Sequence, residues 1–136
     1  MKSALIITTI LVLTFAGFIA YNFINNSKQD MNKPIDISPA EFQEMIQDEP
    51  GVVIDVRTDQ EYNSGHLSLA QYQYDFSGGE FAKRMDSLDK NKTYYLYCRT
   101  GNRSGQAARL MKENGFENVY NVGGFEDLAD EGFETK

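Results

Sequence analysis

The apolar residues of this chain follow two different patterns, and the first is a long uncharged run at the N-terminus. From Ser3 to Ser27 there are 25 residues without a charged side chain, and 4–21 is the most apolar part. A helix of about 20 apolar residues spans the hydrocarbon core of a bilayer. Lys2, ahead of the run, provides the positively charged start of an export signal. Residues 1–27 are therefore expected to be a transmembrane anchor or a signal segment.

An uncleaved anchor is the preferred interpretation, because the apolar run exceeds the core of about 7–15 residues found in signal peptides. A cleaved signal is the alternative, with Thr14-Phe15-Ala16 as an acceptable cleavage site. A short N-terminus normally stays in the cytoplasm, so we expect the following domain on the other side of the membrane, in a periplasmic or extracytoplasmic position. Cleavage would instead release a soluble periplasmic or secreted form. Residues 28–34 are polar and are expected to be a linker.

The second pattern is a short-period alternation of helix and strand signals over residues 35–134. Ser38-Pro39-Ala40-Glu41 has the residues of a capping box with proline at the first helical position. Apolar residues at helical spacing follow from Phe42, and Pro50-Gly51 ends the predicted helix. Val52-Val53-Ile54 is a β-branched run, typical of a strand buried on both faces of a parallel sheet.

The same signals continue to the C-terminus. Further strands are expected at 71–76, 93–97 and 119–122, and further helices at 59–63, 79–88, 106–114 and after Gly123-Gly124. This alternation predicts an α/β domain with a mainly parallel sheet and helices on both faces. Sites in such sheets lie at the carboxyl ends of the strands, which here are the loops after Ile54 and Tyr97.

The charge and the rare residues exclude several function classes. There are 13 Lys and Arg against 20 Asp and Glu, a net charge of −7, so we expect no nucleic-acid partner. With one cysteine and one histidine, the chain can form neither an internal disulfide nor a Cys-rich zinc site, and it has no His-pair metal motif. No metal site is expected.

The loop that follows the strand 93–97 has the residues of an anion-binding nucleophile site. Cys98 ends the strand, and a run of polar and glycine residues, 99–105, separates it from the predicted helix start. Successive backbone amides in such a loop form an anion-binding nest, and the helix N-terminus adds a positive dipole. A thiol there ionises more easily than a free thiol, and the thiolate is the nucleophile. Arg99 and Arg103 add positive charge that suits an anionic substrate.

The run 97–108 around Cys98 resembles the active-site loop of the rhodanese-like domains. Further stretches are similar to the signatures of that family: Asp55-Val56-Arg57, Glu61-Tyr62, Gly65-His66-Leu67, Gly115-Phe116-Glu117-Asn118-Val119 and Gly123-Gly124-Phe125. The family's fold agrees with the α/β fold predicted above. Two positions depart from the family pattern, Leu69 before Ala70 and Leu128 where a tryptophan is common, and both concern the pocket more than the reaction.

The resemblance implies a sulfurtransferase that uses no cofactor. Cys98 would take a sulfane sulfur from a small anionic donor, thiosulfate or a polysulfide, and pass it to a thiophilic acceptor, a thiol or a protein. Arg99, Thr100, Gly101, Asn102 and Arg103 would bind the substrate. Four residues separate Cys98 from Arg103, fewer than in the related cysteine phosphatases, which favours sulfur over phosphate.

Alternatives remain open at this stage. One is a persulfide carrier or docking module without turnover, and another is a cysteine phosphatase or arsenate reductase. A direct proton-transfer role of His66 is disfavoured, because its motif matches a structural turn position. Asp55 and Arg57 are expected to be structural, with Arg57 and Glu61 pairing along one helical turn.

Overall fold

The computed structural model describes residues 12–22 and 35–136, which fall into two units, Met1–Lys33 and Pro34–Lys136. Residues 12–22 are helical. Within the two described ranges, no helix is both long and apolar enough to cross a bilayer. The membrane segment expected at 4–21 therefore gains no support, and its residues 4–11 lie outside the described part of the chain, as does the whole of the linker expected at 28–34.

The second unit begins as the capping pattern predicts. Helix α2 (Pro39–Asp48) has Ser38 as its N-cap, and the side chains of Ser38 and Glu41 bond reciprocally to each other's backbone N–H. Phe42 is fully buried on its inner face. The chain then enters β1 (Val52–Asp55), a strand whose last three residues are buried.

Four parallel strands form the sheet, in the order β2-β1-β3-β4. The other three are β2 (Tyr72–Gln73), β3 (Thr93–Cys98) and β4 (Asn118–Gly124). The strand expected at 71–76 is reduced to the two residues of β2. The reason is that β1 ends at Asp55, so Tyr74 and Phe76 donate single backbone hydrogen bonds to Asp55 and Val56 without forming a regular ladder.

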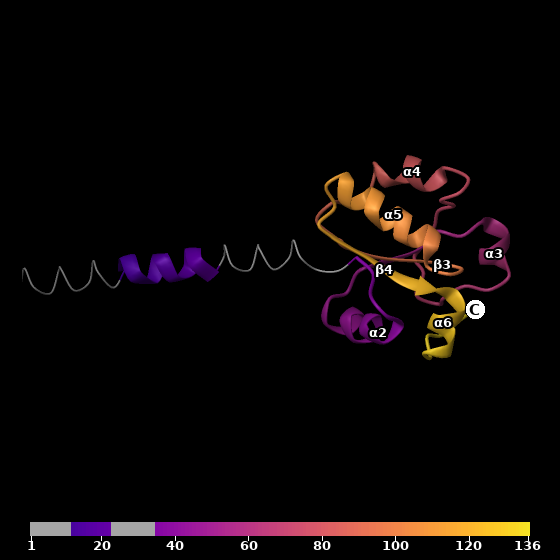
Figure 1. Cartoon of the computed structure of the whole chain (residues 1–136), viewed down its shortest axis with the longest axis horizontal. Helices are drawn as coiled ribbons and strands as arrows, with labels where there is room; N and C mark the ends of the chain where they lie inside the picture. The colour runs from indigo at the N-terminus through magenta and orange to yellow at the C-terminus, as the bar shows by residue number, and fades with distance from the viewer. Residues whose placement is uncertain (1–11, 23–34) are drawn as a thin grey trace, which may run out of the picture. The chain divides into compact units, whose positions relative to one another are not determined.

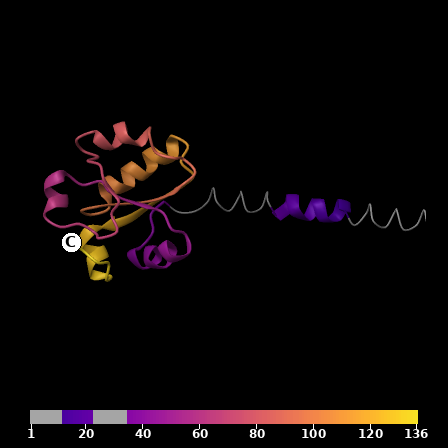
Figure 2. The same ribbon diagram turned by 180° about the vertical axis from the view of Figure 1, so that it is seen from behind.

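Helices cover both faces of the sheet, which confirms the predicted α/β architecture. The helices α4 (Glu80–Met85) and α5 (Asn102–Glu113) pack on one face, and α2 and α6 (Phe125–Asp130) on the other (Figures 1 and 2). The short helix α3 (Asp59–Asn63) follows β1. Helix α5 begins at Asn102, four residues before the predicted start at Gln106, so the prediction of that boundary is wrong.

Residues of β3 alternate between the two faces of the sheet. Tyr94, Leu96 and Cys98 belong to the apolar cluster under α4 and α5. Tyr95 and Tyr97 belong to the cluster under α2 and α6. Because side chains alternate along a strand, the last residue of β3 directs its sulfur toward α5.

Candidate active site

Cys98 lies at the carboxyl end of the central strand β3 and has no exposed surface. The chain leaves the strand through Arg99 and Thr100, turns at Gly101 and enters α5. Gly101 has a φ of +87°, and a Cβ atom there would lie 3.3 Å from the Cα of Gly123. Only glycine adopts this conformation without strain, and it lets the loop return toward the sulfur.

Hydrogen-bond donors converge on the sulfur from the loop and from the first turn of α5. The N–H of Gly101 donates to Cys98 Sγ at 3.1 Å, and the hydroxyl of Ser104 lies 3.4 Å from the same atom. The helix dipole of α5 adds a positive end at this position. The amide nest expected around Cys98 is therefore present.

The pKa of Cys98 is the result of two opposing effects. Burial of the thiol raises its pKa, while the hydroxyl and N–H of Ser104 and the N–H groups of Thr100 and Gly101 lower it. The hydrogen bonds prevail, so the pKa of Cys98 lies below that of a free thiol. The thiolate, which is the nucleophilic form, is favoured at this site.

Arg103 reaches across from α5 to α3. Its guanidinium donates two hydrogen bonds to the carboxylate of Glu61, at 2.8 and 2.7 Å. This pairing lowers the pKa of Glu61 to about 2, with bonds from Thr58 contributing in the same direction. The hydrogen bonds to Glu61 raise the pKa of Arg103, and the sulfur of Cys98 adds to this in the same direction.

The pairing expected between Arg57 and Glu61 is wrong. Arg57 instead bonds Asp55, with 2.7 Å between Nη2 and Oδ2, and donates to the carbonyl of Gly65 at 2.7 Å. Asp55 and Arg57 leave the same strand end and are both buried, so each satisfies the other without crossing to α3. Their predicted structural role agrees with this closed arrangement.

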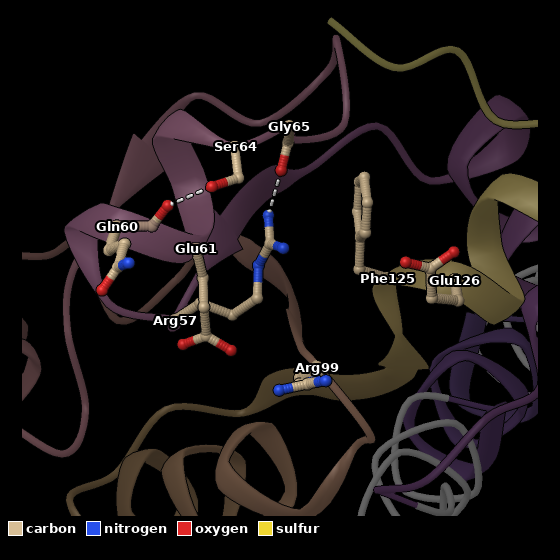
Figure 3. Close-up of a pocket in the computed structure, with 8 residues that line it drawn as sticks. All are labelled: Arg57, Gln60, Glu61, Ser64, Gly65, Arg99, Phe125 and Glu126. Carbon is tan, nitrogen blue, oxygen red and sulfur yellow. Dashed lines mark hydrogen bonds between the residues drawn. The ribbon is translucent and has the colours of Figure 1, made fainter.

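A polar pocket of about 420 Å³ opens beside the loop (Figure 3). It is lined by Arg57, Gln60, Glu61, Ser64, Gly65, Arg99, Phe125 and Glu126. The ring of Phe125 forms one wall of this pocket and faces the guanidinium of Arg57, whose Cζ lies 4.4 Å from the ring centroid. Arg99 lines the pocket from the loop next to Cys98.

The residues expected to bind substrate divide into two groups. Arg99 lines the pocket, Thr100 and Gly101 direct N–H groups at the sulfur, and Arg103 lies beside it. The side chain of Asn102 instead accepts a hydrogen bond from Gln106 and is exposed.

Three residues near the sulfur are absent from the predicted site. Ser104 approaches the sulfur, Glu61 holds Arg103, and Asn121 accepts a hydrogen bond from Ser104 at 2.6 Å. One signal could have revealed Asn121, because it is the one polar amide side chain within the predicted strand 119–122.

His66 has a structural setting. Its Nδ1 lies 3.1 Å from the carbonyl of Tyr62, and its ring stacks on the ring of Tyr62 with 3.7 Å between centroids. Its backbone pairs with that of Lys136 in both directions. These contacts agree with the turn role expected for His66.

Comparison with known proteins shows three curated relatives that match this domain. The putative sulfurtransferase YtwF of Bacillus subtilis is 38% identical over 102 residues, which cover 74% of this chain and 93% of YtwF. The putative sulfur carrier protein YrkF of the same organism is 34% identical over 98 residues, 71% of this chain and 51% of YrkF. The thiosulfate sulfurtransferase PspE of Escherichia coli is 36% identical over 78 residues, 56% of this chain and 72% of PspE. The chain thus spans about half the length of YrkF.

The fold and a family model agree with these relatives. The crystal structure of a rhodanese-related protein from Thermoplasma volcanium superposes with a TM-score of 0.64 at 26% identity, covering 76% of this chain and 98% of that protein. The model of the rhodanese-like domain matches residues 38–131. The chain therefore belongs to the rhodanese-like domain family.

Proposed function

We propose that this protein transfers sulfane sulfur from thiosulfate or a polysulfide to a thiophilic acceptor through a persulfide on Cys98. The observation that carries the proposal is the environment of Cys98 Sγ, which faces the N–H of Gly101 at 3.1 Å and the hydroxyl of Ser104 at 3.4 Å. Preorganised donors of this kind stabilise negative charge that develops on a reacting atom. Relatives named as sulfurtransferases support the same reaction.

In the first step, the Cys98 thiolate attacks the outer sulfur of thiosulfate. A sulfur–sulfur bond forms to Cys98, and the bond between the two thiosulfate sulfurs breaks. Sulfite leaves with the electron pair of that bond. The product is a Cys98 persulfide whose terminal sulfur carries the negative charge. The loop N–H groups receive this charge without reorganising, which is the advantage of a fixed nest.

In the second step, a thiolate acceptor attacks the terminal sulfur of the persulfide. The acceptor gains that sulfur as its own persulfide, and Cys98 leaves as the thiolate. The low pKa of Cys98 makes it a good leaving group as well as an ionised nucleophile. Splitting the transfer into two displacements is covalent catalysis.

Arg99 is the residue that we assign to the charge of the donor. It lines the pocket beside Cys98, whereas Arg57 and Arg103 are each held by a carboxylate, Asp55 and Glu61. A guanidinium on the approach path raises the local concentration of an anion and guides its entry.

A persulfide carrier is the second candidate, because YrkF is named as a putative sulfur carrier protein. A carrier would load Cys98 but turn over slowly with small acceptors. The two candidates differ in turnover number and not in loading.

The testing experiment measures sulfur uptake and release. The residues 35–136 or the full chain are incubated with thiosulfate, and sulfite release and intact mass are followed together. We expect one added sulfur atom, its removal by a thiol, and many sulfite molecules released per protein when the thiol is in excess. A single stoichiometric release of sulfite would favour the carrier. Release of phosphate from phosphoesters without sulfur uptake would contradict both candidates.

We also propose that residues 1–27 place the domain at a membrane, outside the cytoplasm. The support is the charge-free stretch of 25 residues from Ser3 to Ser27 behind Lys2. Cell fractionation is expected to find the protein in membranes and resistant to washing with salt. A soluble mature chain that starts near Gly17 would show that the segment is a cleaved signal.

A further inference from the structure

Asn121 is a buried polar side chain on the sheet behind the Cys98 loop. Its residue is 8% exposed, in the middle of β4. Its neighbours Tyr120 and Val122 belong to the cluster under α2 and α6. Alternation along the strand therefore directs Asn121 to the opposite face, where α5 and Ser104 lie. A buried amide needs partners for all of its polar atoms, and here those partners belong to the active site.

The orientation of the Asn121 amide is determined by its partners. Its Nδ2 lies 2.7 Å from Oδ1 of Asp36 and 3.0 Å from the carbonyl of Gly101. Its Oδ1 receives the N–H of Gly123 at 3.2 Å and the hydroxyl of Ser104 at 2.6 Å. The carbonyl of Gly101 can only accept, and the N–H of Gly123 can only donate. If the amide were turned over, its oxygen would face the carbonyl of Gly101, and its NH2 group would face the N–H of Gly123.

The hydroxyl of Ser104 therefore has two acceptors and one proton. Asn121 Oδ1 lies 2.6 Å from Ser104 Oγ, whereas Cys98 Sγ lies 3.4 Å from it. The shorter contact is close to the optimum for an O–H···O hydrogen bond. Asn121 thus competes with the sulfur for the proton of Ser104.

We propose that Asn121 is a positioning residue that competes with Cys98 for the hydroxyl proton of Ser104, so that the bond from Ser104 to the sulfur stays weak and the thiolate, ionised mainly by the loop amides, stays strongly nucleophilic. The nucleophilicity of a thiolate falls as the pKa of its thiol falls, with a Brønsted slope of about 0.4–0.5. A permanent bond from Ser104 would stabilise the thiolate further and slow its attack. The inference rests on the proposed function only in taking Cys98 as the attacking group.

The charged groups around this network are the same in every variant proposed below. Arg103 faces the sulfur from α5, with Glu61 of α3 behind it. Asp36 accepts a hydrogen bond from Nδ2 of Asn121, whereas Ser104 donates to its Oδ1. Gly101 keeps a second partner for its carbonyl, the N–H of Gly105 at 3.0 Å, so the loop stays joined to α5 when Asn121 is replaced.

The test replaces Asn121 with leucine, which has a similar size and no acceptor. Cys98 is the only thiol of the chain, so thiolate absorbance measured against pH gives its pKa without any substrate. We expect the pKa of Cys98 to fall by about one unit, because the thiolate gains a full hydrogen bond from the hydroxyl of Ser104. The reaction rate of the full thiolate with a small symmetrical disulfide should fall about threefold. Neither measurement requires sulfurtransferase activity, so a failure here is distinguishable from a failure of the proposed function.

The effect of Asn121→Leu is also measured in a protein that carries Ser104→Ala and therefore lacks the hydroxyl. If Asn121 acts through the hydroxyl, Asn121→Leu changes neither the pKa nor the thiolate rate of the Ser104→Ala protein. Asn118→Leu, an asparagine to leucine change on the same strand, is the matched control and should leave both values at those of the unaltered protein. Asn121→Val, a β-branched residue suited to a strand, replaces the leucine variant if that variant does not fold.

A purely structural role of Asn121 gives the opposite sign. Loosening the loop would withdraw N–H groups from the sulfur and raise the pKa of Cys98. A raised or unchanged pKa in a folded Asn121→Leu protein would overturn the proposal. A fall in the pKa of Cys98 that Asn121→Leu still causes in the Ser104→Ala protein would also overturn the proposal.

Discussion

The segments that follow β1 and β3 leave the same edge of the sheet, and each contains an arginine paired with a carboxylate. After β1, the side chains of Arg57 and Asp55 are 5% and 0% exposed, and the carbonyl of Gly65 accepts a further hydrogen bond from the guanidinium. After β3, Arg103 of α5 and its partner Glu61 of α3 are 22% and 25% exposed, and the N–H of Gly101 in the intervening loop donates to a sulfur atom. The two pairs thus differ in burial: the Arg57–Asp55 pair is closed off from solvent, and the Arg103–Glu61 pair beside the Cys98 loop is partly open to it.

The largest expected effect concerns the sulfur itself. Cys98→Ser should abolish sulfur uptake and sulfite release completely, because a hydroxyl ionises far less readily than this thiol. The free energy of unfolding should change little, since serine fits the same space. Intact mass spectrometry after incubation with thiosulfate checks the first statement, and denaturant unfolding checks the second. Any residual protein-bound sulfur in the variant would contradict the assignment.

Breaking the buried pair of Arg57 and Asp55 should lower the stability of the fold, which Cys98→Ser leaves nearly unchanged. Asp55→Ala leaves the guanidinium of Arg57 buried without its carboxylate, which we expect to lower the free energy of unfolding by about 3–5 kcal/mol. Glu80→Ala is the matched control, because it breaks an exposed pair with Arg84 and should cost less than about 1 kcal/mol. Urea unfolding of both variants compares them. Equal losses would mean that burial does not distinguish the pairs.

The partly exposed pair should make stability depend on pH. The pKa of Glu61 is about 2 in the folded protein against 4.5 for the ordinary carboxyl group. A depressed folded pKa adds stability that is complete above about pH 4.5 and is lost as the pH falls toward about 2. Because a quarter of each side chain is exposed, we expect this contribution to be about 1 kcal/mol. The difference between the native protein and Glu61→Gln, followed by urea unfolding, should shrink over that range, and a constant difference would contradict the pairing.

The smallest expected effect on the fold belongs to Arg99, which neither pair includes. Arg99→Ala should change the free energy of unfolding by less than about 0.5 kcal/mol, as exposed loop positions usually do. The KM for thiosulfate should rise several-fold at low ionic strength and approach that of the native protein at about 1 M salt, where the Debye length is about 3 Å. Steady-state sulfite release at two salt concentrations measures both. An unchanged KM at low salt would remove the anion-guiding role.

The sequence alone determined the elements whose signals are local. The capping box at Ser38 and Glu41 needs only residues within one helical turn, and the run Val52-Val53-Ile54 needs only its own β-branched side chains. The position of Cys98 between a strand and a polar loop was likewise visible, because neighbouring residues define it. Such features depend on local backbone geometry and on residue type, which the order of the residues already contains.

The tertiary structure decided which distant side chains meet. Glu61 pairs with Arg103, 42 residues away, and not with Arg57, four residues away, because the fold buries Arg57 against Asp55 and brings α3 beside α5. The polar run from Asn102 is helical and not a loop, as its Ser104 finds a buried partner in Asn121 of β4. Hydrogen bonds and ion pairs of this kind depend on which strands become neighbours, and the pattern along a single segment contains no such information.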